Sequence, residues 1–166
     1  MALAMKPRPF ASTRHDQFEV YAEGLGAYTI DVSIPANAAP NSRLPVIVAL
    51  DGNLIFDLVQ AIAHGGFAQA GGPLPPAIIV GVGYPSSEGF ASFYARRNFD
   101  FHGSWDMRDP LGLQLQQLFA ALKAAENKPQ LEMGAGGYAR FLEFLRDELL
   151  ASLAAHYPID LSGRHT

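Results

Sequence analysis

The candidate nucleophiles of this chain are its nine serines, because the sequence contains no cysteine. A serine that attacks an ester needs a general base beside it and N–H donors for the tetrahedral oxyanion. On a sharp strand-to-helix turn, such a serine is marked by glycines two residues before and after it, as G-x-S-x-G. No serine here has both flanking glycines; they are Ser12, Ser33, Ser42, Ser86, Ser87, Ser92, Ser104, Ser152 and Ser162.

The five histidines form no metal-binding pattern. No two of them have the spacing that puts ligands on one helix face, and H-E-x-x-H does not occur, so no metal is implied. His102 stands in a loop that we expect to border the site. His156, near the end of a predicted helix, is expected to interact with the helix C-terminus. The histidines are His15, His64, His102, His156 and His165.

The stretch Asp51-Gly52-Asn53-Leu54 follows an apolar run and precedes a helical pattern. Gly52 allows the backbone to turn, and Asn53 is a good helix N-cap. A helix N-terminus presents free N–H groups and the positive end of the helix dipole, which together favour anions. Two interpretations remain open: an ordinary capped turn, or a turn that stabilises negative charge.

The segment after Tyr84 is rich in aromatic residues and in charges of both signs. We expect Arg97 and Asp100 to pair and hold this segment in place. For Arg96 and Arg97, a structural ion pair is favoured over contact with an anionic substrate. The aromatic side chains fit a binding pocket and a core below a long loop equally well; they are Tyr84, Phe99, Phe101 and Trp105.

Apolar periodicity predicts a hairpin followed by a βαβ unit. Alternation in residues 17–35 indicates two antiparallel strands joined at E-G-L-G. The five residues 46–50 are all apolar, which is typical of a strand buried on both faces of a parallel sheet. Helical spacing from residue 53 to 64 and a second apolar run within 75–84 complete the unit, with a right-handed crossover.

Residues 84–137 are predicted to be a long, largely irregular, lid-like excursion with one short amphipathic helix within 111–127. A final helix follows from about Tyr138 to His156, and a third parallel strand is expected to begin at about Arg164. The prediction is a single, incomplete domain over residues 1–166, with residues 1–16 as a lead-in. The apolar stripe of the final helix consists of Phe141, Leu142, Leu145, Leu149 and Leu153.

Composition limits the class of protein. With 166 residues, 49% apolar and 17% charged, the chain is long and apolar enough for one globular core. A net charge of −4 without a basic cluster argues against nucleic acid and against an anionic membrane surface. The N-terminus has no signal-peptide pattern and no stretch has the length of a membrane span. We expect a cytoplasmic protein, with a periplasmic protein after signal removal as the alternative.

Four stretches, in this order, resemble the enterochelin (siderophore) esterase family of α/β-hydrolases: LPVIVALDGNLIFD, PAIIVGVGYP, ARRNFDF and GGYARFLEFLRDELLASLAAHYPID. The resemblance covers residues 18–166. It implies an α/β-hydrolase sheet and hydrolysis of a small-molecule carboxylic ester through a serine acyl-enzyme, without a cofactor. It places the nucleophilic serine after the strand expected at Arg164 and the catalytic histidine later still. We therefore expect the N-terminal half of such an enzyme, inactive by itself.

The resemblance also implies the site residues. One oxyanion donor of the fold comes from the loop after the third strand, so the backbone N–H groups of Gly52, Asn53 and Leu54 are the candidates. The family's R-x-x-D-aromatic stretch is normally followed by Thr-Pro, whereas H-G-S-W follows here, which predicts a different lip of the site. An arginine of this stretch would face an anionic or catecholate substrate. The candidate substrate-binding residues are Tyr84, Arg97, Phe101, His102 and Trp105.

Two other classes of protein are weighed against this interpretation. G-A-G-G-Y-A at residues 134–139 formally matches the dinucleotide motif G-x-G-x-x-A, but the preceding N-K-P-Q-L-E-M is too polar and too short for the required strand. A non-catalytic chain of hydrolase ancestry is the stronger alternative. Its exposed sheet edge would pair with a second copy or with a separate C-terminal piece. Esterase activity and oligomeric state distinguish these possibilities.

Overall fold

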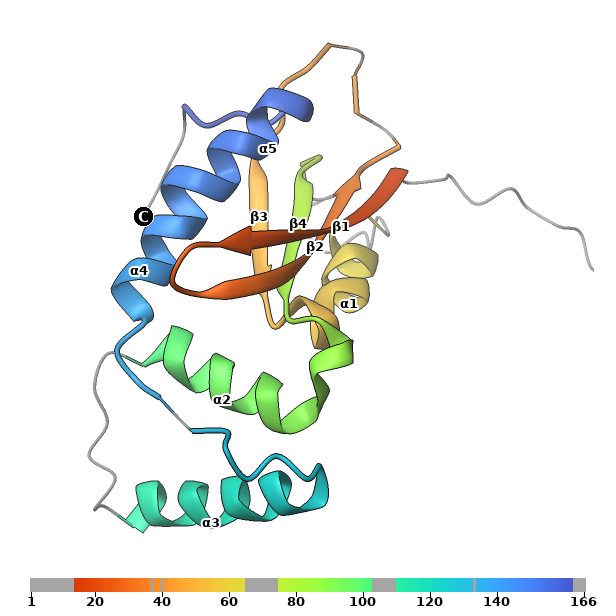
Figure 1. The fold of residues 1–166 in the computed structure, drawn as a ribbon. Helices are drawn as coiled ribbons and strands as arrows, with labels where there is room; N and C mark the ends of the chain where they lie inside the picture. The colour runs from red at the N-terminus through yellow and green to blue at the C-terminus, as the bar shows by residue number, and fades with distance from the viewer. Residues whose placement is uncertain are drawn as a thin grey trace, which may run out of the picture.

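The computed structural model describes residues 14–36, 38–39, 41–64, 75–102, 110–132 and 134–162. These residues form a four-stranded mixed sheet in the order β1-β2-β4-β3, with helices on both faces (Figure 1). The elements are β1 (Arg14–Ala22), β2 (Gly26–Ile34), β3 (Val46–Leu50), α1 (Gly52–His64), β4 (Ile78–Gly83), the 3-10 turn η1 (Ser86–Glu88), α2 (Gly89–Phe101), α3 (Pro110–Ala125), α4 (Tyr138–Glu143), the π-helical turn η2 (Phe144–Leu149) and α5 (Leu150–His156).

The predicted hairpin is confirmed. Strands β1 and β2 pair antiparallel, with Phe18 opposite Ile30, and the turn between them lies at residues 23–25. Strand β1 begins at Arg14, three residues earlier than predicted, so it takes in the end of the expected lead-in. The hairpin joins the sheet through β2, which pairs antiparallel with β4.

The βαβ unit is also confirmed, with α1 connecting two parallel strands in which Val48 lies opposite Val80. Strand β4 is central, and all six of its residues are buried. Strand β3 is not buried on both faces as predicted, since Ile47 is 45% exposed. The reason is that β3 is the last strand of the order, and among the described residues its outer edge has a partner only just before the strand begins.

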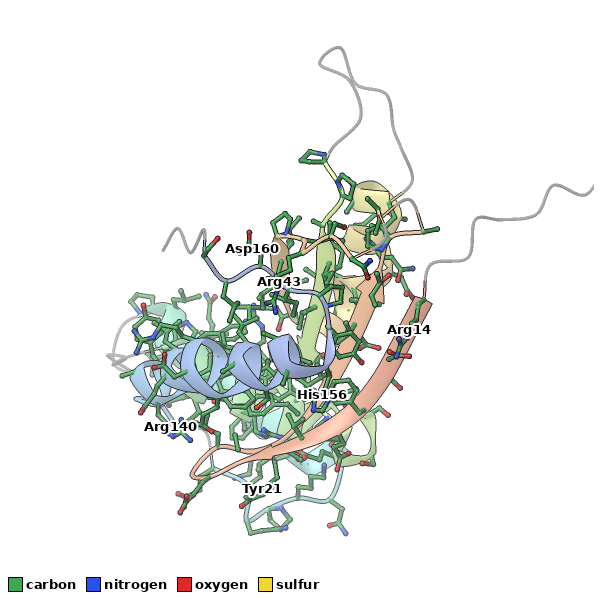
Figure 2. The ribbon with its side chains drawn as sticks, turned by 90° about the horizontal axis from the view of Figure 1, so that it is seen from above. Arg14, Tyr21, Arg43, Arg140, His156 and Asp160 are labelled. Atoms are coloured by element: carbon green, nitrogen blue, oxygen red, sulfur yellow. The ribbon has the colours of Figure 1, made fainter. Side chains whose placement is uncertain are left out.

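That partner is the segment that follows α5. Ile159 forms a parallel bridge with Leu44. Leu44 donates its N–H to the carbonyl of Pro158 (2.8 Å) and accepts from the N–H of Asp160 (2.7 Å). The Arg43 guanidinium also donates to the carbonyl of Ile159 (3.1 Å), and Figure 2 shows Arg43 close to Asp160. The chain therefore reaches the free edge of β3 five residues before the predicted start at Arg164, which lies outside the described residues.

The prediction that residues 84–137 are largely irregular was wrong for much of this segment. Helix α3 was predicted, but α2 was not. The helical pattern of α2 is hidden because two of its inward-facing residues, Asn98 and Asp100, are polar. Both have hydrogen-bond partners inside the protein, so polar side chains occupy core positions that periodicity assigns to apolar ones.

The final helix runs from Tyr138 to His156, as predicted, with a π-helical turn in its middle. One predicted core position is wrong: Leu142 is exposed, and Phe144 is buried instead. Phe141 and Phe144 pack with the β2 side chains on one face of the sheet. On the other face, Phe56 of α1 packs on Ile79. No helix among the described residues combines the length and apolar character needed to cross a membrane.

We expect Phe141→Ala to lower the free energy of unfolding by about 3–5 kcal/mol, because the ring is 2% exposed and the cavity left behind cannot fill. The ring lies 5.6 Å from that of Tyr28 and 5.7 Å from that of Phe101. Urea unfolding of the purified chain measures the loss. Leu142→Ala, on the next residue but 43% exposed, is the control and should cost much less. Equal losses would show that the final helix packs differently.

Candidate active site

The turn after β3 is built around Asp51, which has a left-handed backbone with φ of 55°. The carbonyl of Asp51 accepts hydrogen bonds from the N–H groups of Leu54 (2.7 Å) and Ile55 (3.1 Å). Leu54 is therefore the weakest of the three predicted oxyanion donors, because its N–H is already used. Among the described residues, the N–H groups of Gly52 and Asn53 make no backbone hydrogen bond.

This turn lies in direct contact with the end of β4. A Cβ on Gly52 would stand 2.8 Å from the backbone nitrogen of Val82, and a Cβ on Gly83 would stand 2.8 Å from the backbone nitrogen of Asn53. Real Cβ atoms do not come that close, so glycine is required at both positions. The two strand ends are held together backbone to backbone.

Asn53 is not the N-cap that its residue type predicted. Helix α1 already begins at Gly52, so Asn53 belongs to its first turn. Its side-chain oxygen instead accepts the backbone N–H of Tyr84 at 3.4 Å. Asn53 thus connects the turn after β3 with the first residue after β4.

Arg97 does not pair with Asp100, so that prediction was wrong. Its Nε donates to both carboxylate oxygens of Asp51, at 2.9 and 3.0 Å. The Asp51 carboxylate raises the pKa of Arg97. The Arg97 guanidinium also lies over the ring of Phe101, 4.9 Å from its centroid. An ion pair is present as expected, but the acid comes from the turn after β3 rather than from α2.

Asp100 is buried and accepts two hydroxyl donors instead. The hydroxyls of Tyr28 and Tyr84 both donate to its Oδ2, at 2.7 and 3.0 Å. Burial is the dominant effect on this carboxyl and raises the pKa of Asp100, against the opposing effect of the two hydroxyls. Tyr84 is 3% exposed, so most of its side chain lies in the core.

Arg96 is also structural. Its guanidinium lies between the rings of Tyr28 and Tyr84, 4.8 and 5.0 Å from their centroids. It donates to the carbonyls of Ala27 and Leu25 and to the Glu88 carboxylate. With these contacts satisfied inside the protein, Arg96 is committed to the packing of α2 against the hairpin.

The remaining predicted residues lie at the end of α2. Phe101 packs against Phe141 as part of the core. The Nδ1 of His102 lies 3.1 Å from the carbonyl of Asn98, and the carbonyl of His102 accepts the N–H of Gly136. Both residues therefore hold α2 against neighbouring segments. Trp105 lies outside the described residues.

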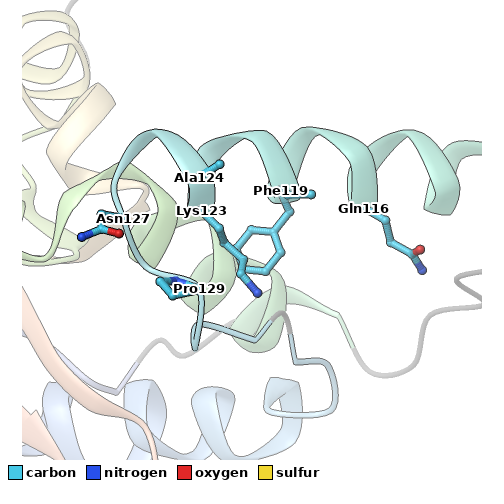
Figure 3. A pocket seen from close by; sticks show the side chains of 7 residues that line it. Gln116, Phe119, Lys123, Ala124, Asn127 and Pro129 are labelled. Carbon is cyan, nitrogen blue, oxygen red and sulfur yellow. The ribbon is translucent and has the colours of Figure 1, made fainter.

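A cavity that the sequence did not reveal lies directly beside the turn. It has a volume of about 190 Å³, and its lining is mostly apolar: Asn53, Leu54, Tyr84, Pro85, Ser86, Gly89, Phe90 and Phe93. Phe90 stands out because it is 53% exposed and stacks on Phe93. A larger cavity of about 700 Å³ follows α3 near Phe119 and Lys123, but it shares no residue with the turn (Figure 3).

One serine contacts a histidine elsewhere in the described chain. The Ser33 hydroxyl lies 3.3 Å from Nδ1 of His64, whose Nε2 is 3.0 Å from the carbonyl of Ala77. A nucleophile needs such a base, but Ser33 is 0% exposed and cannot meet a substrate. This contact joins α1 to the sheet and is not a catalytic pair.

Similarity to known proteins identifies the fold that carries this turn. The chain is 28% identical over 140 residues to the ferri-bacillibactin esterase BesA of Bacillus subtilis (strain 168), a match that covers 80% of this chain and 41% of BesA. The BES protein from Bacillus cereus is 28% identical, with a TM-score of 0.58 over 94% of this chain and 53% of that one. The chain has an α/β-hydrolase fold. These matches also support a siderophore esterase-like family.

The siderophore hydrolase EstB from Aspergillus nidulans, at 20% identity, supports the fold alone, with a TM-score of 0.60 over 95% of this chain and 48% of that protein. No family model matches the chain. The chain thus spans about half the length of these three similar proteins.

We expect Asp100→Asn to make the protein relatively more stable as the pH rises. Because the pKa of Asp100 is raised in the folded state, the folded chain keeps its proton at pH values where the unfolded chain has lost it. The parent therefore loses stability as the pH rises above the ordinary value of 3.8. Asparagine carries no charge and still offers an oxygen to both tyrosines.

Urea unfolding at pH 3.5 and pH 7 tests this, and the difference between Asp100→Asn and the parent should grow in favour of asparagine at pH 7. Asp100→Leu is the control. It leaves two buried hydroxyls without an acceptor and should cost about 1–3 kcal/mol for each of them at both pH values. A difference between asparagine and aspartate that does not change with pH would show that Asp100 titrates normally.

Proposed function

We propose that this chain is the N-terminal part of a serine hydrolase that cleaves carboxylic esters of the siderophore type. The observation that carries the proposal is the turn after β3. Its Gly52 and Asn53 N–H groups have no backbone partner among the described residues, and it lies beside a small apolar cavity in a chain 28% identical to BesA. An anion at this helix N-terminus would be stabilised by the N–H groups and the helix dipole.

In this mechanism the turn acts on the carbonyl oxygen of the ester. When a serine hydroxyl attacks the carbonyl carbon, negative charge develops on that oxygen, and the N–H of Asn53 or Gly52 donates to it. Such donors act where the charge appears, so they stabilise the transition state more than the bound ester. The Leu54 N–H contributes least, because it donates to Asp51.

The nucleophile would come from the strand position next to β3. Ile159 already pairs in parallel with Leu44, just before β3 begins. A strand that continued in this direction would end beside the carboxyl end of β3, because parallel strands share that edge of the sheet. The turn after it would then bring a serine close to Asn53. This geometry supports a catalytic serine contributed by residues that follow those described.

The small cavity suggests the part of the ester that binds next to the reacting carbonyl. Its mostly apolar lining, with Phe90 and Phe93 stacked at 5.4 Å between ring centroids, suits an apolar or aromatic group of modest size. BesA is a ferri-bacillibactin esterase by name. An ester of a siderophore is therefore the substrate class that we propose.

The first test compares the 166-residue chain with the product of its complete reading frame. We expect the intact mass and the reading frame to extend past Thr166 into a G-x-S-x-G stretch. Only that longer product should react with a fluorescent fluorophosphonate and hydrolyse a p-nitrophenyl ester. Hydrolysis by the 166-residue chain, blocked by the fluorophosphonate, would overturn its predicted inactivity. A reading frame without G-x-S-x-G, giving a product that does not react, would overturn the proposed enzyme.

Assembly without catalysis is the second candidate function, and exposed apolar residues favour it. Ile47 at the free edge of β3, and Leu54, Leu58 and Ile62 along α1, are each 45–63% exposed. An edge strand and an exposed apolar helix face are each a ready site for another chain. Light scattering after size-exclusion chromatography distinguishes the two functions. A stable dimer, with no fluorophosphonate-reactive product from the gene, would favour assembly.

If the cavity binds substrate, Phe90→Ala should change which esters are hydrolysed. We expect kcat/KM of the full product for an aromatic acyl ester to fall about tenfold, the size of one lost aromatic contact. The value for an acetyl ester should change less than about twofold, because a small acyl group does not reach the ring. Leu118→Ala on α3, also exposed but outside the cavity, is the control. An equal loss of kcat/KM for both esters would show that the cavity does not select the substrate.

A further inference from the structure

The strongest unassigned feature near the turn is the ion pair between Arg97 and Asp51. Its two groups come from α2 and from the turn after β3, 46 residues apart in the chain. Arg97 is 37% exposed and Asp51 is 18% exposed at the side chain, so the pair lies at the margin of the core. Exposed pairs contribute little to stability, and such a position raises the question of another role.

Asp51 is the residue that shapes the turn. It is a non-glycine residue with φ of 55°, a backbone conformation that an ordinary side chain adopts only where its surroundings hold it. Its carbonyl accepts the N–H groups of Leu54 and Ile55. The orientation of Asp51 therefore decides which N–H groups of the turn are used and which are left for a ligand.

Arg97 is well suited to hold Asp51 in that conformation. Its Nε meets both carboxylate oxygens within 3.0 Å, and its guanidinium is supported by the Phe101 ring on the next turn of α2. A charged hydrogen bond of this kind is stronger and more directional than a neutral one. The carboxylate, and with it the backbone of Asp51, is thereby tied to α2.

The same helix also holds the neighbouring strand end. Asp100, one turn after Arg97, accepts the hydroxyl of Tyr84, and the backbone N–H of Tyr84 donates to the Asn53 side chain. These contacts form a closed loop. Asp51 pairs with Arg97, and α2 carries both Arg97 and Asp100. Asp100 binds Tyr84, which in turn binds Asn53 in the turn that begins with Asp51. Both strand ends that flank the free N–H groups are thus fastened to one helix.

We propose that Arg97 is a positioning residue that, through Asp51, holds the Gly52 and Asn53 N–H groups in the direction needed to stabilise an oxyanion. The inference rests on the proposed esterase function and extends it to α2. Arg97 acts through another residue and contacts neither the ester nor the reacting atoms. The competing roles are a substrate contact with an anionic ester and an ion pair that serves stability alone.

The test uses the product of the complete reading frame with the variants Arg97→Met, Arg97→Lys and Asp51→Asn. Arg146→Met is the control, because Arg146 also pairs with an aspartate but lies on the outer surface of the final helix. Three quantities are measured for each variant: kcat, KM for a neutral and an anionic ester, and the Kd of an arylboronic acid. The boronic acid binds a serine enzyme as a tetrahedral anion and so reports on the oxyanion position.

We expect kcat of Arg97→Met to fall about 30-fold to 100-fold, somewhat less than the loss of a whole oxyanion donor. KM should stay within about threefold for both esters, and the Kd of the boronic acid should rise with the loss in kcat. Arg97→Lys should recover part of kcat, since it keeps the charge. Asp51→Asn should resemble Arg97→Met. A double variant that combines Arg97→Met with Asp51→Asn should be no worse than either single variant, because both substitutions remove the same contact.

Each other outcome decides against the proposal. A KM that rises for the anionic ester alone, with kcat unchanged, makes Arg97 a substrate contact. Loss of urea stability with kcat and boronic acid binding at the level of Arg146→Met makes the pair structural only. If the parent itself neither hydrolyses an ester nor reacts with a fluorophosphonate, the proposed function fails first, and the role of Arg97 in it fails with it.

Discussion

The close approach of two backbones is the constraint on which the rest of this structure depends. The turn after β3 lies against the end of β4 because Gly52 and Gly83 have no side chains at the contact. A single added methyl group at either position would push the turn away from the strand. The central strand adapts in the same way at Gly81, where a Cβ would stand 2.7 Å from the Phe56 ring. The position of α1, and with it the free N–H groups, follows from this contact.

Helix α2 makes that arrangement rigid from the other side. It carries Arg97 and Asp100 in one turn, and each reaches the end of a different strand. Arg96, between them and the hairpin, adds a third connection through the Tyr28 and Tyr84 rings. A buried carboxyl and two arginines within five residues would be costly if unpaired, and the structure satisfies each with a specific partner. The polar residues of α2 thus specify where the helix sits.

The outer edge of β3, unlike the strand ends held by α2, has few contacts among the described residues. The central strand is fully buried, whereas the outer edge of β3 faces no strand among the described residues and is bridged only just before the strand begins, where Ile159 pairs with Leu44. On β3 itself, Ile47 is 45% exposed. An outer edge available for hydrogen bonds and an exposed apolar side chain therefore occur together on β3, as they do where a sheet continues into a further strand. The proposed catalytic serine and the proposed assembly surface both depend on what occupies this edge.

Local patterns by themselves determined much of the fold. Alternation specified the hairpin, continuous apolar runs specified β3 and β4, and helical periodicity specified α1, α3 and the final helix, because each of these signals comes from residues close in the chain. The α/β-hydrolase fold and the candidates Gly52 and Asn53 came from the resemblance of four stretches to a known family, since the local pattern of the turn left two interpretations open. Helix α2 was not predicted, because buried polar residues interrupt its apolar periodicity.

Only the tertiary structure determined which side chains Arg97 and Asp100 bind. Arg97 and Asp100 are three residues apart and oppositely charged, so their pairing was the natural local inference, yet each finds its partner elsewhere. Asp51 lies 46 residues from Arg97, and Tyr28 lies 72 residues from Asp100. The choice between these partners depends on how α2 docks on the sheet, which is a sum of many contacts distant in the chain. The same holds for the cavity at Phe90 and for the early entry of Ile159 beside Leu44, because spacing in a sequence carries no information about which distant backbone a residue will meet.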